Sequence, residues 1–313
     1  MPTPTSTPTS MQTSAGIPAW TSTQHTNYVA FSYGENPPQY IAIFAPGQGT
    51  ASATITFNGC CIYAIAFDSQ ANLLVSTASG GIFFYPPGST TSTKSLPAQG
   101  GFSLALSQLG DIAIGGYNSG PSVAIYPNES SSAMYDVSGQ PAFGGLAFSP
   151  SGELAVPMAN GTVETFSHGS ATANRTLPVD LIGGGGVNLA VVAYDGLGNL
   201  ALSSPLLTTV SIYAPGATSP SYTVSGFNTV QSLVFDATNR LIVGDGASIK
   251  IFAAGSSTLV KTISTSEAVA LAVDSSGDIA QAGYGLSSHV YQANGNVVTF
   301  NGLTGAQGVA ISP

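Results

Sequence analysis

The hydrophobic residues of this chain fall in short runs with the two-residue alternation of β-strands, and the runs recur as a repeated unit. A unit contains an apolar strand that ends in Asp or Ser, a tight turn, and a second apolar strand, as in residues 64–68 and 73–75. The first strands end at Asp68, Ser107, Ser149, Asp195, Asp236, Asp274 and Ser312. Their spacing of 38 to 46 residues is typical of one four-stranded blade of a β-propeller.

An aromatic residue ends a later strand of every unit and gives a second count of the repeat. These residues are Phe44, Tyr85, Tyr126, Phe166, Tyr213, Phe252 and Tyr291. No complete first strand precedes Phe44, and no unit follows the first strand at 309–312, so the two chain ends together supply one blade from strands 28–34, 40–45, 51–57 and 309–312. The sequence therefore predicts an all-β, seven-bladed propeller of four-stranded antiparallel blades. The C-terminal strand joins the N-terminal blade and closes the ring, which removes exposed sheet edges.

The two faces of each first strand differ in size. Large apolar side chains stand one and three residues before the terminal Asp or Ser, as Phe148 and Leu146 do. The position between them is Ala in six of the seven units, with Val234 as the exception. Because blades converge toward the axis, we expect the large face of one blade to pack on the small face of its neighbour.

The turn after the first strand often begins with Asp and has Gly at its fourth position, as in residues 195–199. One interpretation is a ring of carboxylates that binds calcium. The other is that each Asp caps its own turn. Ser replaces Asp at Ser107, Ser149 and Ser312, which favours turn capping. We therefore predict no cofactor, and the sequence gives no support to a calcium ion in the channel.

Charge is scarce in this 313-residue chain. Only 6% of residues are charged and the net charge is −9, whereas about 25% of an average domain is charged. The bases are scattered at Lys94, Arg175, Arg240, Lys250 and Lys261. Nucleic-acid binding requires basic residues that neutralise phosphates, so that class of partner is excluded. Docking on anionic membranes is disfavoured for the same reason, and no apolar run approaches the roughly 18 residues of a membrane span.

Residues 1–24 are rich in Pro, Thr and Ser and predict a linker or stalk, followed by the propeller at 25–313. Tracts of this kind often follow a signal or lipid anchor. We therefore expect a removed signal or anchor, no membrane insertion by this part of the chain, and an extracellular, periplasmic or cell-surface location.

The two cysteines, Cys60 and Cys61, are adjacent. Two neighbouring residues cannot form a metal site alone, because zinc sites use spaced ligands. A disulfide between adjacent cysteines is strained and labile. A pair of free thiols and a vicinal disulfide both remain open.

Residues 271–279 (LAVDSSGDI) and 146–154 (LAFSPSGEL) resemble the repeats of NHL and YVTN-type propellers, and the resemblance covers residues 28–313. These families include bacterial secreted or lipid-anchored proteins, so the resemblance implies such a protein here. The NHL pattern usually continues with Asp or Asn after the second strand, whereas residues 76–79 read Ser-Thr-Ala-Ser. The family's binding mode is therefore not carried over.

In propellers that resemble this one, ligands bind the face with the loops between blades and between the second and third strands. The candidates on that face are Glu35, Cys60, Cys61, Tyr63, Phe102, Tyr117, Asp180, Gln231, Asp245, Tyr284 and Gln307. Tyrosine and amide side chains are suited to stack on and hydrogen-bond a sugar or peptide. The alternative is that Tyr63 and Phe102 only fill the channel mouth.

No catalytic constellation stands out. The three histidines, His25, His168 and His289, are widely separated, whereas zinc catalysis usually needs three converging protein ligands. No Gly-x-Ser-x-Gly elbow occurs. The sequence favours a non-enzymatic binding scaffold for a protein or carbohydrate at the cell surface. A metal-dependent lactonase or lyase with its site at the channel mouth, and a self-assembling surface protein, remain the alternatives.

Overall fold

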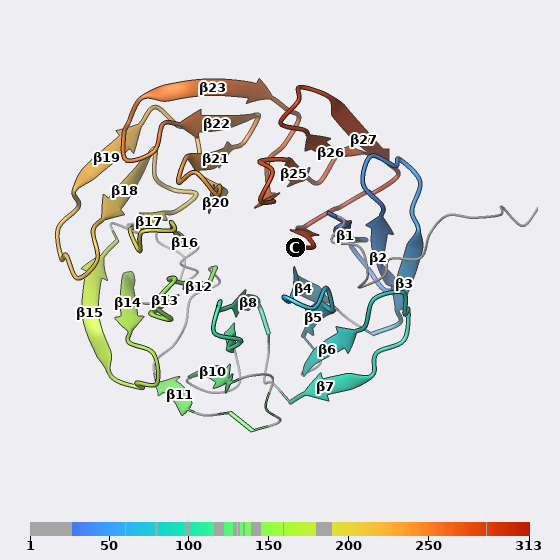
Figure 1. The fold of residues 1–313 in the computed structure, drawn as a ribbon, viewed down its shortest axis with the longest axis horizontal. Helices are drawn as coiled ribbons and strands as arrows, with labels where there is room; N and C mark the ends of the chain where they lie inside the picture. The colour runs from blue at the N-terminus through green and yellow to red at the C-terminus, as the bar shows by residue number, and fades with distance from the viewer. Residues whose placement is uncertain are drawn as a thin grey trace, which may run out of the picture.

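The structure is a computed structural model that describes residues 27–59, 61–78, 81–97, 101–115, 122–127, 130, 132–133, 135–138, 145–158, 160–179, 190–285 and 287–313. Over this part of the chain, 28 strands form seven four-stranded antiparallel sheets around a central axis (Figure 1). The predicted seven-bladed propeller is confirmed. Within the same residues, no helix is long and apolar enough to span a membrane.

Each blade runs from an inner strand at the axis to an outer strand at the rim. Blade 1 contains β28 (Gly308–Ile311), β1 (Val29–Tyr33), β2 (Gln39–Phe44) and β3 (Ala53–Phe57). Blade 2 contains β4 (Ile62–Phe67), β5 (Leu73–Thr77), β6 (Gly81–Tyr85) and β7 (Lys94–Leu96), and blade 3 contains β8 (Ser103–Leu106), β9 (Ile112–Gly115), β10 (Ser122–Tyr126) and β11 (Tyr135–Ser138). Blade 4 contains β12 (Ala147–Phe148), β13 (Leu154–Pro157), β14 (Thr162–Phe166) and β15 (Ala173–Pro178), and blade 5 contains β16 (Val191–Tyr194), β17 (Leu200–Ser203), β18 (Thr209–Tyr213) and β19 (Tyr222–Ser225). Blade 6 contains β20 (Ser232–Phe235), β21 (Leu241–Asp245), β22 (Ser248–Phe252) and β23 (Leu259–Ser264), and blade 7 contains β24 (Ala270–Val273), β25 (Ile279–Ala282), β26 (Ser287–Tyr291) and β27 (Val297–Asn301).

The two ends of the chain share blade 1, as predicted. Strand β28 pairs antiparallel with β1, and Val29 lies opposite Ile311 while Phe31 lies opposite Val309. The side chains at this junction are buried together with residues of blade 7. The strands begin and end within two residues of the predicted bounds. The ring is thus closed by hydrogen bonds between residues almost a chain length apart.

The blades pack large face on small face, as the inner-strand pattern predicts. Ile65 of β4 and Ala310 of β28 belong to one buried cluster at the junction of blades 1 and 2. Val309 of β28 in turn belongs to one buried cluster with Ala280 of blade 7, and Ala272 packs against that cluster. The predicted aromatic ends the third strand of every blade, and six of the seven are buried at a blade junction. The core of this protein therefore lies between the blades.

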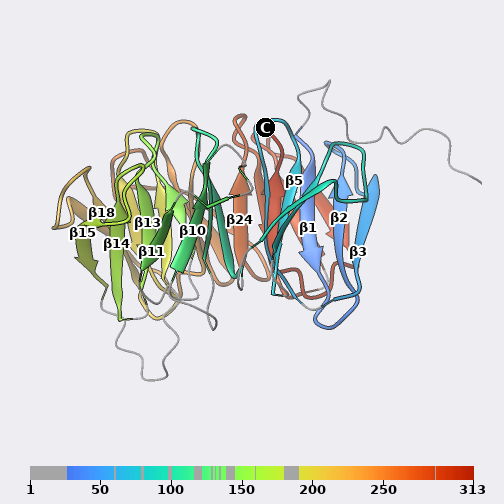
Figure 2. The same ribbon diagram turned by 90° about the horizontal axis from the view of Figure 1, so that it is seen from below.

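The propeller has two faces, which we name by their connections. The turn face carries the turns after the inner strands, at 68–72, 107–111, 149–153, 195–199, 236–240 and 274–278, and the chain ends there after β28 (Figure 2, top). The loop face is opposite and carries the segments 34–38, 226–231, 246–247 and 302–307. The inner strands run from the loop face to the turn face, so their first residues surround the axis at the loop face.

Turn residues hold the turn face together. The Oδ1 atom of Asp68 accepts hydrogen bonds from the backbone N–H groups of Gln70 and Asn72, both at 2.8 Å. In blade 3 the Oγ atom of Ser107 replaces the carboxylate and accepts a hydrogen bond from the N–H of Asp111 at 2.9 Å. At the first position of the turn, Asp and Ser thus both accept hydrogen bonds from backbone N–H groups of their own turn. These contacts agree with the turn-capping interpretation of the repeat.

Candidate functional site

The inner strands enclose a cavity of about 520 Å³ at the loop face, around the propeller axis. Large side chains of the inner strands form part of its wall, namely Leu104, Val192, Leu233 and Leu271. Each stands three residues before the Asp or Ser that ends the inner strand of its blade. The repeat has a large apolar residue at this position. The taper of the ring therefore leaves an apolar cavity where the inner strands begin.

Four of the residues that the sequence nominated for binding line this cavity: Phe102, Gln231, Tyr284 and Gln307. They come from blades 3, 6, 7 and 1, and each precedes an inner strand or follows β25. Gln307 is exposed, and Tyr284 is 48% exposed. The closed ring brings these residues to one site although more than 200 residues separate the first from the last. Whether they bind a ligand stays a prediction.

Two further candidates lie next to the lining residues. The ring of Tyr63 packs against that of Phe102 in a tilted arrangement, with the centroids 4.0 Å apart and an interplanar angle of 39°. Phe102 lines the cavity and Tyr63 does not, and whether the pair binds a ligand or only fills the channel mouth stays a prediction. Glu35 is exposed and lies against Gly305, because a Cβ atom added to Gly305 would stand 2.9 Å from Cγ of Glu35. Tyr117 and Asp180 lie outside the described residues.

Asp245 does not line the cavity but holds the segment that leads into it. Its carboxylate is buried, pairs with Nζ of Lys250 at 2.6 Å, and accepts hydrogen bonds from the N–H groups of Asn228 and Thr229 at 2.6 and 3.0 Å. Burial by itself raises the pKa of this carboxyl, but the hydrogen bonds from Lys250, Thr229 and Asn228 outweigh it and lower the pKa below its usual value. The Asp245 carboxylate thereby holds residues 228–229, just before Gln231, through two backbone hydrogen bonds.

Gln231 carries a buried polar atom that lacks a partner. Its backbone N–H bonds to the carbonyl of Gly244 at 2.9 Å, which anchors the residue at the start of β20. Its Oε1 atom is buried and has no hydrogen-bond partner among the described residues. The sequence alone gave no sign of this feature, because it depends on which neighbours surround the amide.

Cys61 forms a disulfide in the structure, and the chain has only one other cysteine, Cys60. This corresponds to the vicinal-disulfide alternative, although Cys60 itself lies outside the described residues. Cys61 has a φ of 70°, which few residues other than Gly adopt, and its carbonyl accepts a hydrogen bond from the N–H of Ala78 at 2.9 Å. The cysteine lies two residues before Tyr63 and therefore next to the cavity edge.

The two described histidines lie on separate blades. Nε2 of His168 is 3.0 Å from Oδ2 of Asp111 at the turn face. His289 lies on β26, with Nδ1 3.1 Å from Oε1 of Gln281, and burial lowers its pKa. His25 lies outside the described residues. Over the described part of the chain, no three His, Cys, Asp or Glu side chains form a group that could hold a metal ion.

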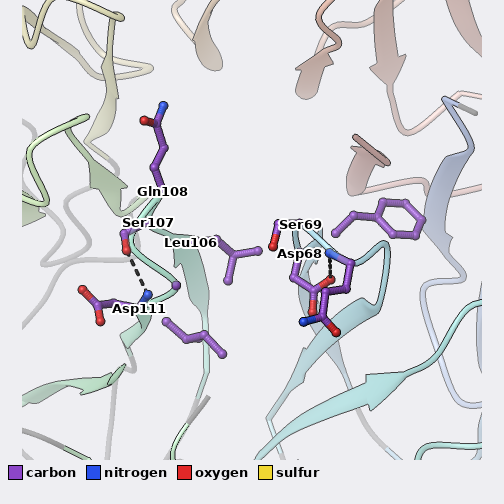
Figure 3. Close-up of a pocket in the computed structure, with 10 residues that line it drawn as sticks. Asp68, Ser69, Leu106, Ser107, Gln108 and Asp111 are labelled. Carbon is purple, nitrogen blue, oxygen red and sulfur yellow. Dashed lines mark hydrogen bonds between the residues drawn. The ribbon is translucent and has the colours of Figure 1, made fainter. Parts of the chain in front are cut away.

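The turn face has a second cavity, of about 470 Å³, between the first turns of blades 2 and 3. Asp68 and Asp111 lie on opposite sides of it, with Leu106 between them (Figure 3). Sequence reasoning did not find this cavity, because it assigned Asp68 to its turn alone. Asp68 and Ser107 already bond to their own turns, whereas Ser69, Gln70 and Gln108 also line this cavity.

Comparison of the sequence with models of protein families and with curated proteins gave no match.

Proposed function

We propose that this chain is an NHL/YVTN-type binding scaffold that acts outside the cytoplasm and receives its partner at the loop-face cavity. The partner is a protein or a carbohydrate at the cell surface. The cavity of about 520 Å³ at the loop face carries this proposal, because concave sites with an apolar lining and a few polar groups are the usual ligand sites of proteins.

Exposed residues near the mouth of the loop-face cavity also support a binding site there. Tyr284 and Leu206 are exposed at the loop face, at 48% and 61%, although each is large and apolar. Leu206 adjoins Pro205, which lines the cavity. Apolar side chains that gather around a cavity mouth favour a recognition surface over an inert one. A rigid ring, held by seven blade junctions, suits a scaffold that keeps such residues in place.

An extracellular location is consistent with the disulfide of Cys61, since such bridges persist in oxidising compartments. Fractionation of the source cells with an antibody to the chain tests the location. We expect the protein in the surface or secreted fraction, and recovery from the cytosol alone would overturn this part of the proposal.

A matched pair of substitutions tests the site of binding. Gln307 and Gln108 are both exposed glutamines, and they line the loop-face and turn-face cavities respectively. We expect Gln307→Trp to weaken binding to any glycan or extracellular protein that the unaltered chain selects from an array, by about ten-fold or more. Gln108→Trp should leave that binding unchanged. Binding that survives Gln307→Trp but is lost in Gln108→Trp would place the partner on the turn face and refute the proposal.

A further inference from the structure

We propose that the loop-face cavity receives the uncharged end of an oligosaccharide, which packs on the ring of Tyr284 and hydrogen-bonds to the side chains of Gln307 and Glu35. This inference rests on the proposed function and names the class of its partner.

The first observation is that one short segment brings these three residues together. Segment 302–307 follows β27 and leads into β28, so it lies at the junction of blades 7 and 1. The N–H of Gly305 bonds to the carbonyl of Tyr284 at 3.4 Å, and a Cβ atom added to Gly305 would stand 2.9 Å from Cγ of Glu35. Gly305 has a φ of 71°, so the backbone conformation and the limited space both favour glycine here. Tyr284 and Glu35 therefore both adjoin Gly305, two residues before Gln307.

The same segment is tied to the end of β1. The N–H of Gly34 bonds to the carbonyl of Thr304 at 3.1 Å, and the N–H of Gln307 bonds to the carbonyl of Ser32 at 3.1 Å. These bonds hold the backbone next to Glu35 and at Gln307 before any ligand arrives. Ordering a site costs a ligand less free energy when the backbone of that site is already held.

The second observation is the chemistry of the three side chains. Tyr284 is 48% exposed and lines the cavity, and Gln307 and Glu35 are exposed. A sugar ring has an apolar face of C–H groups, which is removed from water when it packs on an aromatic ring. Its hydroxyl groups both donate and accept hydrogen bonds. They are matched by a carboxamide, which donates and accepts, and by a carboxylate, which accepts.

The third observation is the size and lining of the cavity. Its volume of about 520 Å³ lies within the roughly 300–1,000 Å³ of small-ligand sites, so it admits the end of a chain molecule and not a folded domain. The apolar wall at Leu104, Leu233 and Leu271 suits the C–H faces and the methyl or acetyl groups of a sugar. The terminal unit of an oligosaccharide fits both properties.

The fourth observation is the charge near the mouth. Glu35 is exposed, and the net charge of the chain is −9. Both repel an anionic group, most strongly at low ionic strength. Sugars that carry carboxylate or sulfate groups are therefore disfavoured, and the sugar that enters is uncharged.

Isothermal titration calorimetry of the full chain with maltopentaose, cellopentaose, mannopentaose and chitopentaose tests the class of ligand. We expect at least one of these neutral sugars to bind at a single site with a dissociation constant below about 1 mM. The same sugar with its primary alcohols oxidised to carboxylates should bind at least about ten-fold more weakly at low salt. If none of the neutral sugars bound, or if the oxidised form bound as tightly as the neutral one, the inference would be overturned.

Substitutions at Tyr284 test the packing of the sugar on its ring. Tyr284→Ala removes the ring and should weaken binding of the sugar by about ten-fold or more, whereas Tyr284→Phe keeps the ring and should weaken it by less than about three-fold. Leu197→Ala is the control, because Leu197 is 71% exposed at the turn face, and it should leave binding unchanged. Equal losses in the two Tyr284 variants, or a loss in Leu197→Ala, would refute the contact. Circular dichroism of each variant establishes that it folds.

Glu35→Gln tests the selection against anions. It removes the charge and keeps the shape of the side chain, so the preference for the neutral sugar over its oxidised form should fall by about three-fold or more at low salt. An unchanged preference would show that Glu35 does not face the ligand and would refute its part in the site.

The two proposals can fail separately. If a protein partner is selected from the array and lost in Gln307→Trp while no sugar binds, the scaffold function stands and the carbohydrate inference is wrong. If a sugar binds at Tyr284 as described but the selected partner is lost in Gln108→Trp and not in Gln307→Trp, the carbohydrate site stands and the proposed function is wrong.

Discussion

The junction of blades 1 and 7, where the two chain ends meet, offers a direct test of ring closure. Phe31 of β1 is fully buried, and its ring centroid lies 5.1 Å from that of Phe300 on β27, at an interplanar angle of 49°. Both side chains belong to one buried cluster with Val309 of β28. The two rings touch only because the ring of blades is closed.

We therefore propose the substitutions Phe31→Leu and Phe300→Leu, separately and together. Each removes part of a buried aromatic side chain, so each should lower the free energy of unfolding by about 1–3 kcal/mol. Each single change also destroys the ring pair, which is worth about 0.5–1.5 kcal/mol beyond its buried area. The double variant loses that pair only once, so its cost should be smaller than the sum of the two by about 0.5–1.5 kcal/mol.

Urea unfolding followed by far-ultraviolet circular dichroism at pH 7 measures these free energies. The matched control combines Phe31→Leu with Phe166→Leu, since Phe166 is equally buried but lies in blade 4, across the ring. Changes at such distant sites should be additive within about 0.5 kcal/mol. If the Phe31 and Phe300 changes were also additive within that range, the two blades would not be in contact and the closed ring would be refuted.

Three further predictions concern burial, close packing and pH. Leu146→Asp places an unpaired charge in the junction of blades 3 and 4 and should cost several kcal/mol; a soluble variant with a cooperative thermal transition would contradict this. Gly244→Ala brings a Cβ atom within 2.6 Å of the carbonyl oxygen of Ala268 and should lower stability by about 1–3 kcal/mol, measured by the urea midpoint. Folding lowers the pKa of the Asp245 carboxyl. The ionised carboxylate therefore stabilises the folded chain fully at pH values above its unfolded pKa of about 3.9. This stabilisation is lost as the pH falls through the lower pKa of the folded state. Asp245→Asn, which also leaves Lys250 without its partner, should therefore be less stable than the unaltered chain at pH 7, and the difference should shrink below about pH 4; a constant difference across that range would refute the pair.

Most of the fold could be predicted because every blade of a propeller carries the same short sequence pattern. The turn residue, the alternation of large and small positions on the inner strand, and the aromatic at the end of the third strand each occur once per blade. Ala310 between Val309 and Ile311 is the same pattern at the C-terminus as Ala66 between Ile65 and Phe67 in blade 2. The count of these signals fixed both the number of blades and the closure by β28.

The site was predicted less completely, because it depends on contacts between blades. Phe102, Gln231, Tyr284 and Gln307 were nominated from their place before an inner strand or in a loop, and they line one cavity. Asp245 was nominated for the same reason, yet its carboxylate turns to Lys250 on the next strand. Lys250 lies opposite Val243 in the pairing of β21 with β22, so only the tertiary structure shows that its side chain reaches the carboxylate of Asp245.

The sequence by itself determined the strands, their order and the closed ring, because backbone pairing and burial follow from a pattern that each repeat carries locally. The tertiary structure alone decided where open space remains, which buried polar atoms lack a partner among the described residues, and that none of the described residues lining the loop-face cavity is charged. These properties arise when side chains distant in the chain converge on an axis, so no single repeat contains them.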